Sequence, residues 1–374
     1  MRMLAGIAGF ALLLMVLRDA FETIILPRRV NRRFRLTSVF YRTFWRAWRG
    51  VAIRLSGRFR ENSLSWFGPL SLLVLLAVWA VTIVLAFGML HFSAGSALTM
   101  AGNTPGFLDD LYLSGTTFFT LGMGDVVPRI AVAKFLTVCE AGLGFAFLAI
   151  IIGYLPVIYQ AFSRREIIIS LLDARAGSPP SASELLRRHR SDRDRDDVSR
   201  LLAEWERWSA EVLESHLSYP VLAYFRSQHS NQSWLAALTT MLDTSALVMV
   251  GFDGWCVRQA SLTFAMARHA AVDLAQVFSA RQPTVPTDRL TQEQFDLLME
   301  QLRVGGMDFH ENGAAARLTE LRAMYEPYVV ALSEYLALPL PAWIRQSNHA
   351  DNWEGAPWTV RVDEVKKGAP KEHF

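Results

Sequence analysis

A short glycine-containing segment, Thr120–Asp125, has the residue types needed to coordinate a dehydrated cation. A cation that sheds its water needs replacement oxygens, and backbone carbonyl groups aimed at one axis provide them without a fixed charge. Successive carbonyls can point the same way if the backbone alternates through left-handed conformations, which glycine adopts at no steric cost. Gly122 and Gly124 occupy alternate positions, and Thr120 can add a hydroxyl oxygen at the inner end. We therefore expect this segment to bind a permeant cation.

The residues before this segment predict a short helix that enters the membrane only part of the way. Residues 107–120 are apolar but fall short of the roughly 20 residues needed to cross a bilayer. Asp109 and Asp110 stand at the start, where carboxylates cap free N–H groups and oppose the positive end of the helix dipole. Irregular backbone at membrane depth must line a water-filled path or be buried in protein. A pore of this kind therefore requires several copies of the chain.

Two apolar stretches of spanning length flank the segment. Residues 66–90 contain no charged side chain, and residues 135–159 contain only Glu140. A third stretch, residues 3–26, predicts a first spanning helix, because it lacks the small-residue cleavage site of a signal peptide. Its charged residues are interpreted as an ion cluster near the inner membrane surface, with a gating element as the alternative; they are Arg18, Asp19 and Glu22.

The order of helix, short helix, glycine segment and helix resembles the potassium channel pore family over roughly residues 64–163. The resemblance implies an outer helix, a pore helix, a filter and an inner helix, assembled as a homotetramer around one axis. It implies that K⁺ is the permeant ion and that no other cofactor or metal is held. The filter would comprise Thr120, Leu121, Gly122, Met123 and Gly124, with Asp125 behind its outer mouth and Gly144 as the hinge glycine of the inner helix.

Three further residues are assigned to support of the filter: Thr116, Thr117 and Glu140. A carboxyl group on the inner helix is costly in lipid, so Glu140 is expected to face protein or water. It could tune the pore or bond the pore helix of a neighbouring subunit. The plainer interpretation, a hydrogen-bonded packing residue, remains open.

One residue departs from the family pattern. Met123 stands where the family usually has Tyr or Phe, whose ring braces the filter against aromatic residues of the pore helix. A thioether packs softly and has no hydroxyl group. A weakly selective cation channel therefore stays open as an alternative. A glycine-rich extracellular turn without conduction, on a chain that acts as a membrane-anchored scaffold or sensor, is the alternative from a different class.

Composition divides the chain into a membrane half and a water-soluble half. The 374 residues are 52% hydrophobic and only 20% charged, against the usual quarter. Residues 1–163 carry 15 basic and 7 acidic side chains, whereas residues 164–374 carry 23 and 28. The two cysteines are too few for a disulfide scaffold or a thiolate zinc site. We expect five regions: a first spanning helix (1–26), an arginine-rich segment (27–63), a pore domain (64–163), a helical cytoplasmic domain (164–345) and a mobile tail (346–374).

The arginine-rich segment predicts the orientation of the chain. Eleven arginines and no acidic residue lie between Arg28 and Arg60, which places this connection in the cytoplasm by the positive-inside bias. A multi-pass protein of the plasma (inner) membrane follows, with its N-terminus outside and its C-terminal domain in the cytoplasm. Aromatic residues recur at helical spacing opposite the arginines, a pattern typical of a helix bound to anionic lipid. Nucleic acid is not an expected partner.

The second half predicts helices and offers no catalytic site. Residues 184–218 are expected to form one long charged helix, unless their mixed charges mark a break. Residues 234–252 are expected to form a buried core helix, and residues 255–279, 293–303 and 314–336 further helices. No glycine-rich nucleotide-binding loop is recognisable. His269 with Asp273, and Asp308 with His310 and Glu311, could hold a metal but lack a second histidine at ligand spacing. An enzyme is therefore not expected.

Overall fold

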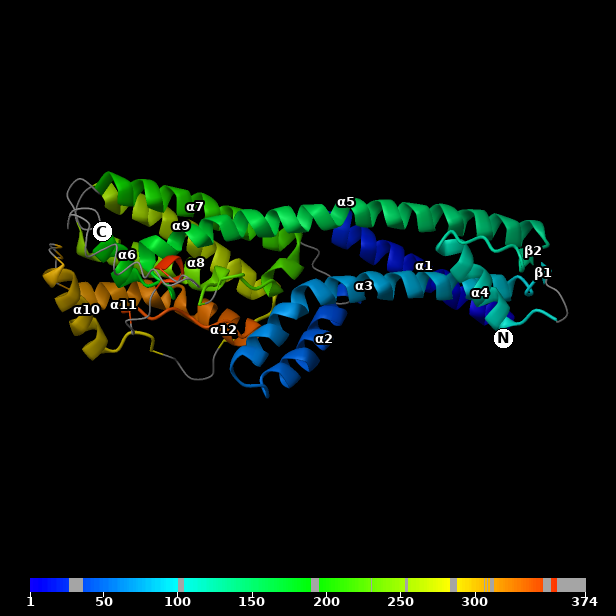
Figure 1. Ribbon diagram of the computed structural model, residues 1–374, viewed down its shortest axis with the longest axis horizontal. Helices are drawn as coiled ribbons and strands as arrows, with labels where there is room; N and C mark the ends of the chain where they lie inside the picture. The colour runs from blue at the N-terminus through cyan, green and yellow to red at the C-terminus, as the bar shows by residue number, and fades with distance from the viewer. Residues whose placement is uncertain are drawn as a thin grey trace. The chain divides into compact units, whose positions relative to one another are not determined.

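The computed structural model describes residues 1–26, 36–99, 104–189, 195–229, 231–252, 255–282, 288–305, 307, 309, 313–345 and 351–354. The fold is all-α, as expected, with one short two-stranded sheet (Figure 1). The chain forms two compact units, residues 1–160 (unit 1) and 161–374 (unit 2).

Unit 1 contains the predicted pore elements in the predicted order. Its helices are α1 (Arg2–Ala20), continued by the π-helical turn η1 (Phe21–Ile25), α2 (Leu36–Ala52), α3 (Gly57–Ser93), α4 (Phe107–Phe118) and the first part of α5 (Ala131–Ala176). Strands β1 (Leu98–Thr99) and β2 (Val127–Pro128) pair antiparallel. Helices α1, α3 and α5 each contain a window apolar enough to cross a membrane.

The two predicted spanning stretches of the pore are parts of longer helices. Helix α3 begins nine residues before Trp66, and α5 continues well past Tyr159. Charged side chains end the apolar stretches but do not end the helices, because arginine and glutamate are good helix formers. The centre of unit 1 lies between α1 and α3, where Val16 packs with Leu75, Trp79 and Ile83. Hydrophobic side chains of α5 contact this cluster too.

A buried carboxylate ties three helices of unit 1 together. Asp19 on α1 is 4% exposed and accepts hydrogen bonds from Thr37 N (3.1 Å) and Thr37 Oγ1 (2.6 Å) at the start of α2. Its Oδ2 also accepts from Trp79 Nε1 on α3 at 3.0 Å. Arg18 pairs instead with Glu22, at 2.9 Å. The three charges predicted as one ion cluster thus include an ion pair and a helix-capping carboxylate.

Unit 2 is a helical body built around α8 (Trp234–Gly251). Around it lie the second part of α5, α6 (Ala182–Arg188), α7 (Arg195–Ser218), α9 (Trp255–Val277), α10 (Gln292–Val304), α11 (Ala314–Ala323) and α12 (Glu326–Leu336), with the 3₁₀ turns η3 (Pro220–Tyr224) and η4 (Asn352–Glu354). Every residue of α8 except Met249 is buried. The expected core helix is confirmed, although its composition alone would also suit a membrane span.

Two predicted helices are broken in the structure. The expected long helix over residues 184–218 is divided into α6 and α7, since α6 ends at Arg188 and the charged residues 190–194 lie outside the described part. The expected helix over residues 314–336 divides between Ala323 and Glu326. Pro327 at the start of α12 explains this second break, because proline lacks the N–H that a continuing helix would need.

A buried arginine in α5 organises the start of unit 2. Arg165 is 4% exposed and donates to the carbonyl oxygens of Leu222 (2.9 Å) and Phe225 (2.7 Å). Its Nη1 lies 3.2 Å from Nε2 of His216, whose Nδ1 lies 2.8 Å from the Val212 carbonyl oxygen. Burial and the charge of Arg165 hold the pKa of His216 well below its ordinary value. His216 is therefore neutral, with Nδ1–H donating and Nε2 accepting.

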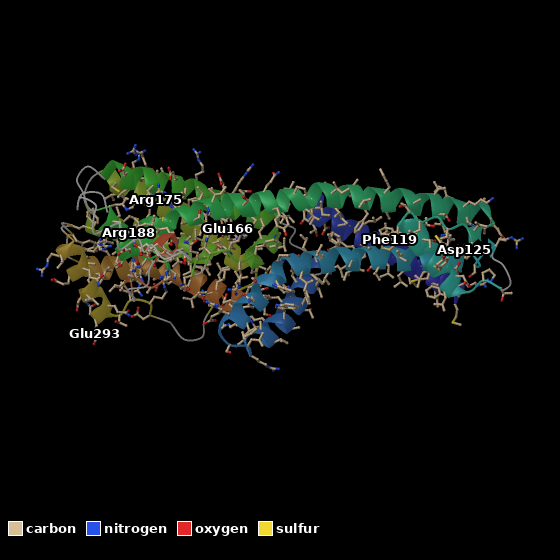
Figure 2. The ribbon with its side chains drawn as sticks, in the orientation of Figure 1. Phe119, Asp125, Glu166, Arg175, Arg188 and Glu293 are labelled. Carbon is tan, nitrogen blue, oxygen red and sulfur yellow. The ribbon has the colours of Figure 1, made fainter. Side chains whose placement is uncertain are left out.

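Part of the segment predicted as a mobile tail is held in place. Asp351 pairs with Arg188 at 2.7 Å and accepts from Ser178 N at 3.1 Å. Asp173, in α5, accepts from Trp353 N at 2.8 Å. Arg188, the partner of Asp351, is the last residue of α6 and is labelled in Figure 2. The remainder of that predicted tail, residues 346–350 and 355–374, lies outside the described residues.

Candidate ion-conducting site

The glycine segment has an alternating left-handed backbone. The φ angle is +56° at Thr120, +56° at Gly122 and +78° at Gly124. This alternation is the conformation that the spacing of the two glycines predicts, and Thr120 adds a third position in the same region. A left-handed backbone is uncommon for a non-glycine residue. Figure 2 labels Phe119 and Asp125, which stand at the two ends of the segment.

Helix α4 delivers the chain to this segment. Asp109 caps its start by accepting from Gly106 N at 2.8 Å, as the sequence predicts. At its other end, the Thr117 carbonyl oxygen accepts from Thr120 N at 3.0 Å. The Thr116 carbonyl oxygen accepts from Leu121 N at 2.8 Å. The backbone carbonyls of these two threonines thus fold Thr120 and Leu121 back on the end of α4, and the role of the threonines in filter support stays a prediction.

The outer helix and the inner helix both approach α4 at glycine residues. A Cβ added at Gly88 on α3 would lie 3.2 Å from the Cα of Leu111. One added at Gly144 on α5 would lie 2.1 Å from the carbonyl oxygen of Phe118, too close for any side chain. Helix α5 is continuous through Gly144. This residue, assigned from the resemblance as a hinge, therefore also has a packing role at the base of the filter.

Three contacts brace the outer mouth. Strands β1 and β2 pair Leu98 with Pro128, which joins the loop before α4 to the loop after the filter. Leu98 also packs with Leu113 and Val126 in a small buried cluster. Tyr112 donates from its hydroxyl group to Asp125 Oδ2 at 3.0 Å. Asp125 is thus held by Tyr112, a residue whose spacing along the chain does not point to it, and the placement of Asp125 behind an outer mouth stays a prediction.

The side chains of the filter segment are uncovered within one chain. Leu121 is 64% exposed, Met123 66% and the preceding Phe119 60%. Apolar side chains at these levels of exposure, next to a left-handed backbone, lack the packing that would fix them in a single chain. They form a contiguous part of the chain that further protein could cover.

Glu140 is buried against α3 and α4. Its side chain is fully buried, and Oε1 is hydrogen-bonded to Ser114 Oγ on α4. Ser114 also donates to the Val84 carbonyl oxygen at 2.7 Å, and His91 Nε2 lies 3.9 Å from Glu140 Oε2. The expectation that this carboxyl group faces protein fits the geometry. Ser114 and His91 were missed, because nothing in their spacing along the chain points to Glu140.

Unit 2 offers no metal centre in the part of the chain that the structure describes. His269 Nε2 lies 3.1 Å from Asp273 Oδ2, one helical turn away on an exposed face of α9. Such a pair is an ordinary surface contact. The group formed by Asp308, His310 and Glu311 lies outside the described residues.

Comparisons with known proteins agree with the geometry of unit 1. A family model described as "Ion channel" matches residues 73–160. This match supports an ion channel. It runs from within α3 through α4 and the filter into α5, and together with the apolar helices it indicates a membrane protein with a transport role.

Two curated relatives extend the similarity. The chain is 22% identical over 206 residues to the uncharacterized membrane protein YdjJ of Bacillus subtilis (strain 168), covering 54% of this chain and 59% of the relative. It is 34% identical over 87 residues to the protein LctB of Geobacillus stearothermophilus, covering 21% of this chain and 64% of the relative. The chain thus spans about three fifths of the length of each. No solved structure matches it.

Proposed function

We propose that four copies of this chain form a potassium-selective cation channel with a backbone-carbonyl filter at residues 120–124. The alternating left-handed backbone at Thr120, Gly122 and Gly124 carries the proposal. Such a backbone is strained for threonine, and it turns successive carbonyl groups in the same direction. The negative end of α4 adjoins it, which favours a cation.

A homotetramer explains the exposed apolar side chains of unit 1. Leu121 and Met123 are each about two thirds exposed in one chain. On α5, Phe135 and Phe145 are exposed at 68% and 69%. A ring of identical subunits would bury the filter side chains against neighbouring copies, while lipid would cover the outer faces.

Potassium over sodium selectivity is the finer part of the proposal. Met123 replaces the aromatic ring of the family pattern, so bracing of the filter rests on other contacts. The bond from Tyr112 to Asp125 and the β1–β2 pair supply such contacts at the outer mouth. A channel braced only there could retain selectivity, or could conduct cations with little discrimination.

Reversal potentials test the proposal. The purified full chain would be reconstituted in planar bilayers with opposed potassium and sodium gradients, and Gly122→Ala would serve as the filter variant. A reversal near the potassium value, abolished by Gly122→Ala, supports a selective channel. A reversal near zero with real current leaves a weakly selective pore, and Met123→Tyr is then the informative variant. Absence of current in tetrameric, folded protein across lipid compositions would contradict conduction.

Helix α2 is proposed to lie on the cytoplasmic membrane surface and to bind anionic lipid. Arg42 and Arg46 are exposed, whereas Trp45 is buried. Trp48 donates from Nε1 to the Ser63 carbonyl oxygen at 2.9 Å, which fixes α2 to α3. The arginines are therefore presented together on one side of an anchored helix. Replacing Arg42 and Arg46 by glutamine should reduce binding to vesicles containing anionic lipid, while neutral vesicles serve as the control.

A further inference from the structure

One serine oxygen joins three helices behind the filter. Ser114 Oγ on α4 lies 2.7 Å from the carbonyl oxygen of Val84 on α3 and is hydrogen-bonded to Glu140 Oε1 on α5. Ser114 and Glu140 are both fully buried. Ser114 precedes Thr120 by six residues. The contact therefore links the inner helix to the helix that carries the filter.

The number of hydrogens at this contact decides which group is protonated. A serine hydroxyl has one hydrogen to donate, and a backbone carbonyl oxygen can only accept. If Ser114 donates to Val84, the contact with Glu140 requires a hydrogen on the carboxyl group. A bare carboxylate would be a buried charge facing a lone pair, which is strongly unfavourable. We infer that Glu140 binds a proton here, with Oε1–H donating to Ser114 Oγ and Ser114 donating to Val84.

The other carboxyl oxygen faces a buried histidine. His91 on α3 is 1% exposed, and its Nε2 lies 3.9 Å from Glu140 Oε2. Among the described residues, neither nitrogen of His91 nor this oxygen has a hydrogen-bond partner. Buried polar atoms without partners are rare and call for an explanation. With its hydrogen on Nε2, neutral His91 presents a donor toward Oε2 and is the group placed to stabilise a carboxylate there.

The cluster therefore has two states. In the first, the neutral acid donates to Ser114 and ties α5 to α4. In the second, the proton has left for bulk water, Glu140 is a carboxylate, and the donor to Ser114 is gone. The charged groups on the adjoining part of α4 are Asp109 and Asp110, and Arg2 on α1 lies near Asp110. Asp110, one turn before Ser114 on α4, is fully buried and accepts from Ser96.

The link between this proton site and conduction rests on the proposed channel function. Loss of the proton at alkaline pH would release the pore helix from the inner helix next to the filter. We expect potassium flux to be lower at alkaline pH than at neutral pH, because the carboxyl group that ties α5 to α4 has lost its proton. In Glu140→Gln the amide donates to Ser114 without titrating, so this pH dependence should disappear.

Infrared spectroscopy tests the proton site without requiring conduction. The purified full chain in lipid should show a carboxylic-acid carbonyl band that shifts in D₂O. The band should be missing in Glu140→Gln and retained in Glu300→Gln, a control at an exposed carboxylate on α10. The wild-type minus Glu140→Gln difference spectrum isolates this group from other buried acids. A difference spectrum with carboxylate bands only would overturn the proposal. Each variant should elute from a gel-filtration column at the same volume as the wild-type assembly, which excludes misfolding.

Flux into vesicles as a function of pH tests the consequence. The ratio of alkaline to neutral flux should be low in wild type and Glu300→Gln, and near one in Glu140→Gln. Replacement of His91 by phenylalanine removes the nearest donor to the Glu140 carboxylate and should move the fall to higher pH. A wild-type profile in Glu140→Gln would overturn the coupling. If no protein conducts, the proposed function fails while the infrared result still decides the proton site.

Discussion

A Cβ atom at Gly144 would lie 2.1 Å from the carbonyl oxygen of Phe118, so the side of α5 at Gly144 lies directly against the backbone at the end of α4. Phe118 is the last residue of α4, two positions before Thr120. The carbonyl groups at this helix end also hold the first filter residues. Packing between α5 and α4 is therefore transmitted directly to the filter.

Replacing Gly144 by alanine should separate α5 from α4. The extra methyl group must displace backbone, and overpacking of this kind costs about 1–3 kcal/mol. Thermal unfolding of the full chain in detergent should show a lower Tm, with reduced potassium flux. Gly142→Ala is the matched control on the same helix, because nothing lies within 4 Å of a Cβ there. An equal loss in both variants would show that the contact with Phe118 is unimportant.

Removal of the Tyr112 hydroxyl should loosen the outer mouth. Tyr112→Phe deletes the donor to Asp125 at 3.0 Å but keeps the ring. The bond is exposed to water, so the loss of stability should be small. The larger expected effect is on the ratio of potassium to sodium permeability, read from reversal potentials. Tyr328→Phe, on α12, is the control, and an unchanged ratio in Tyr112→Phe would argue against this brace.

Asp19 should be needed for folding of unit 1. In Asp19→Ala both carboxylate oxygens are removed, so Thr37 and Trp79 lose the acceptor that they share. Hydrogen bonds to a charged group contribute about 1.5–3 kcal/mol each, so a loss of at least this size in the free energy of unfolding is expected. Trp79→Phe, which removes a single donor at 3.0 Å, should lose less. Denaturation of the purified variants measures both, and equal losses would contradict the assignment.

Unit 2 should lose stability in acid because of Glu184. Burial alone would raise the pKa of this carboxyl group, but hydrogen bonds and charges from Arg187 and Arg188 lower it from 4.5 to about 2. The folded state thus binds the proton more weakly than the unfolded state. The stabilisation is complete above about pH 4.5 and is lost as the pH falls toward 2.

The free energy of unfolding of the full chain, followed by tryptophan fluorescence across this pH range, checks the prediction. Glu184→Gln should be less stable than wild type at neutral pH and should show a flatter decline in acid. Glu293→Gln, at the first turn of α10, provides a control carboxylate whose removal should leave the slope unchanged. Parallel declines in wild type and Glu184→Gln would rule out Glu184 as the source.

The sequence by itself determined the local features of unit 1. Apolar runs of spanning length, an acidic start at Asp109 and alternate glycines at 122 and 124 each act within a few residues of chain. Their conformations therefore follow from hydrophobicity, capping and the steric freedom of glycine. The same is true of α8, where continuous apolar sequence predicts burial, although only the structure distinguishes a protein core from lipid.

The tertiary structure decided which distant residues meet. Ser114, His91 and Tyr112 carry no signal in their own neighbourhoods, and their partners lie 26, 49 and 13 residues away along the chain. Asp19 finds Trp79 across 60 residues. Such pairs depend on the angle and register at which whole helices pack. Many small contacts along the helices together set that angle and register. A composition or a spacing can place a charged residue on a helix, but only packing selects its partner and hence its chemistry.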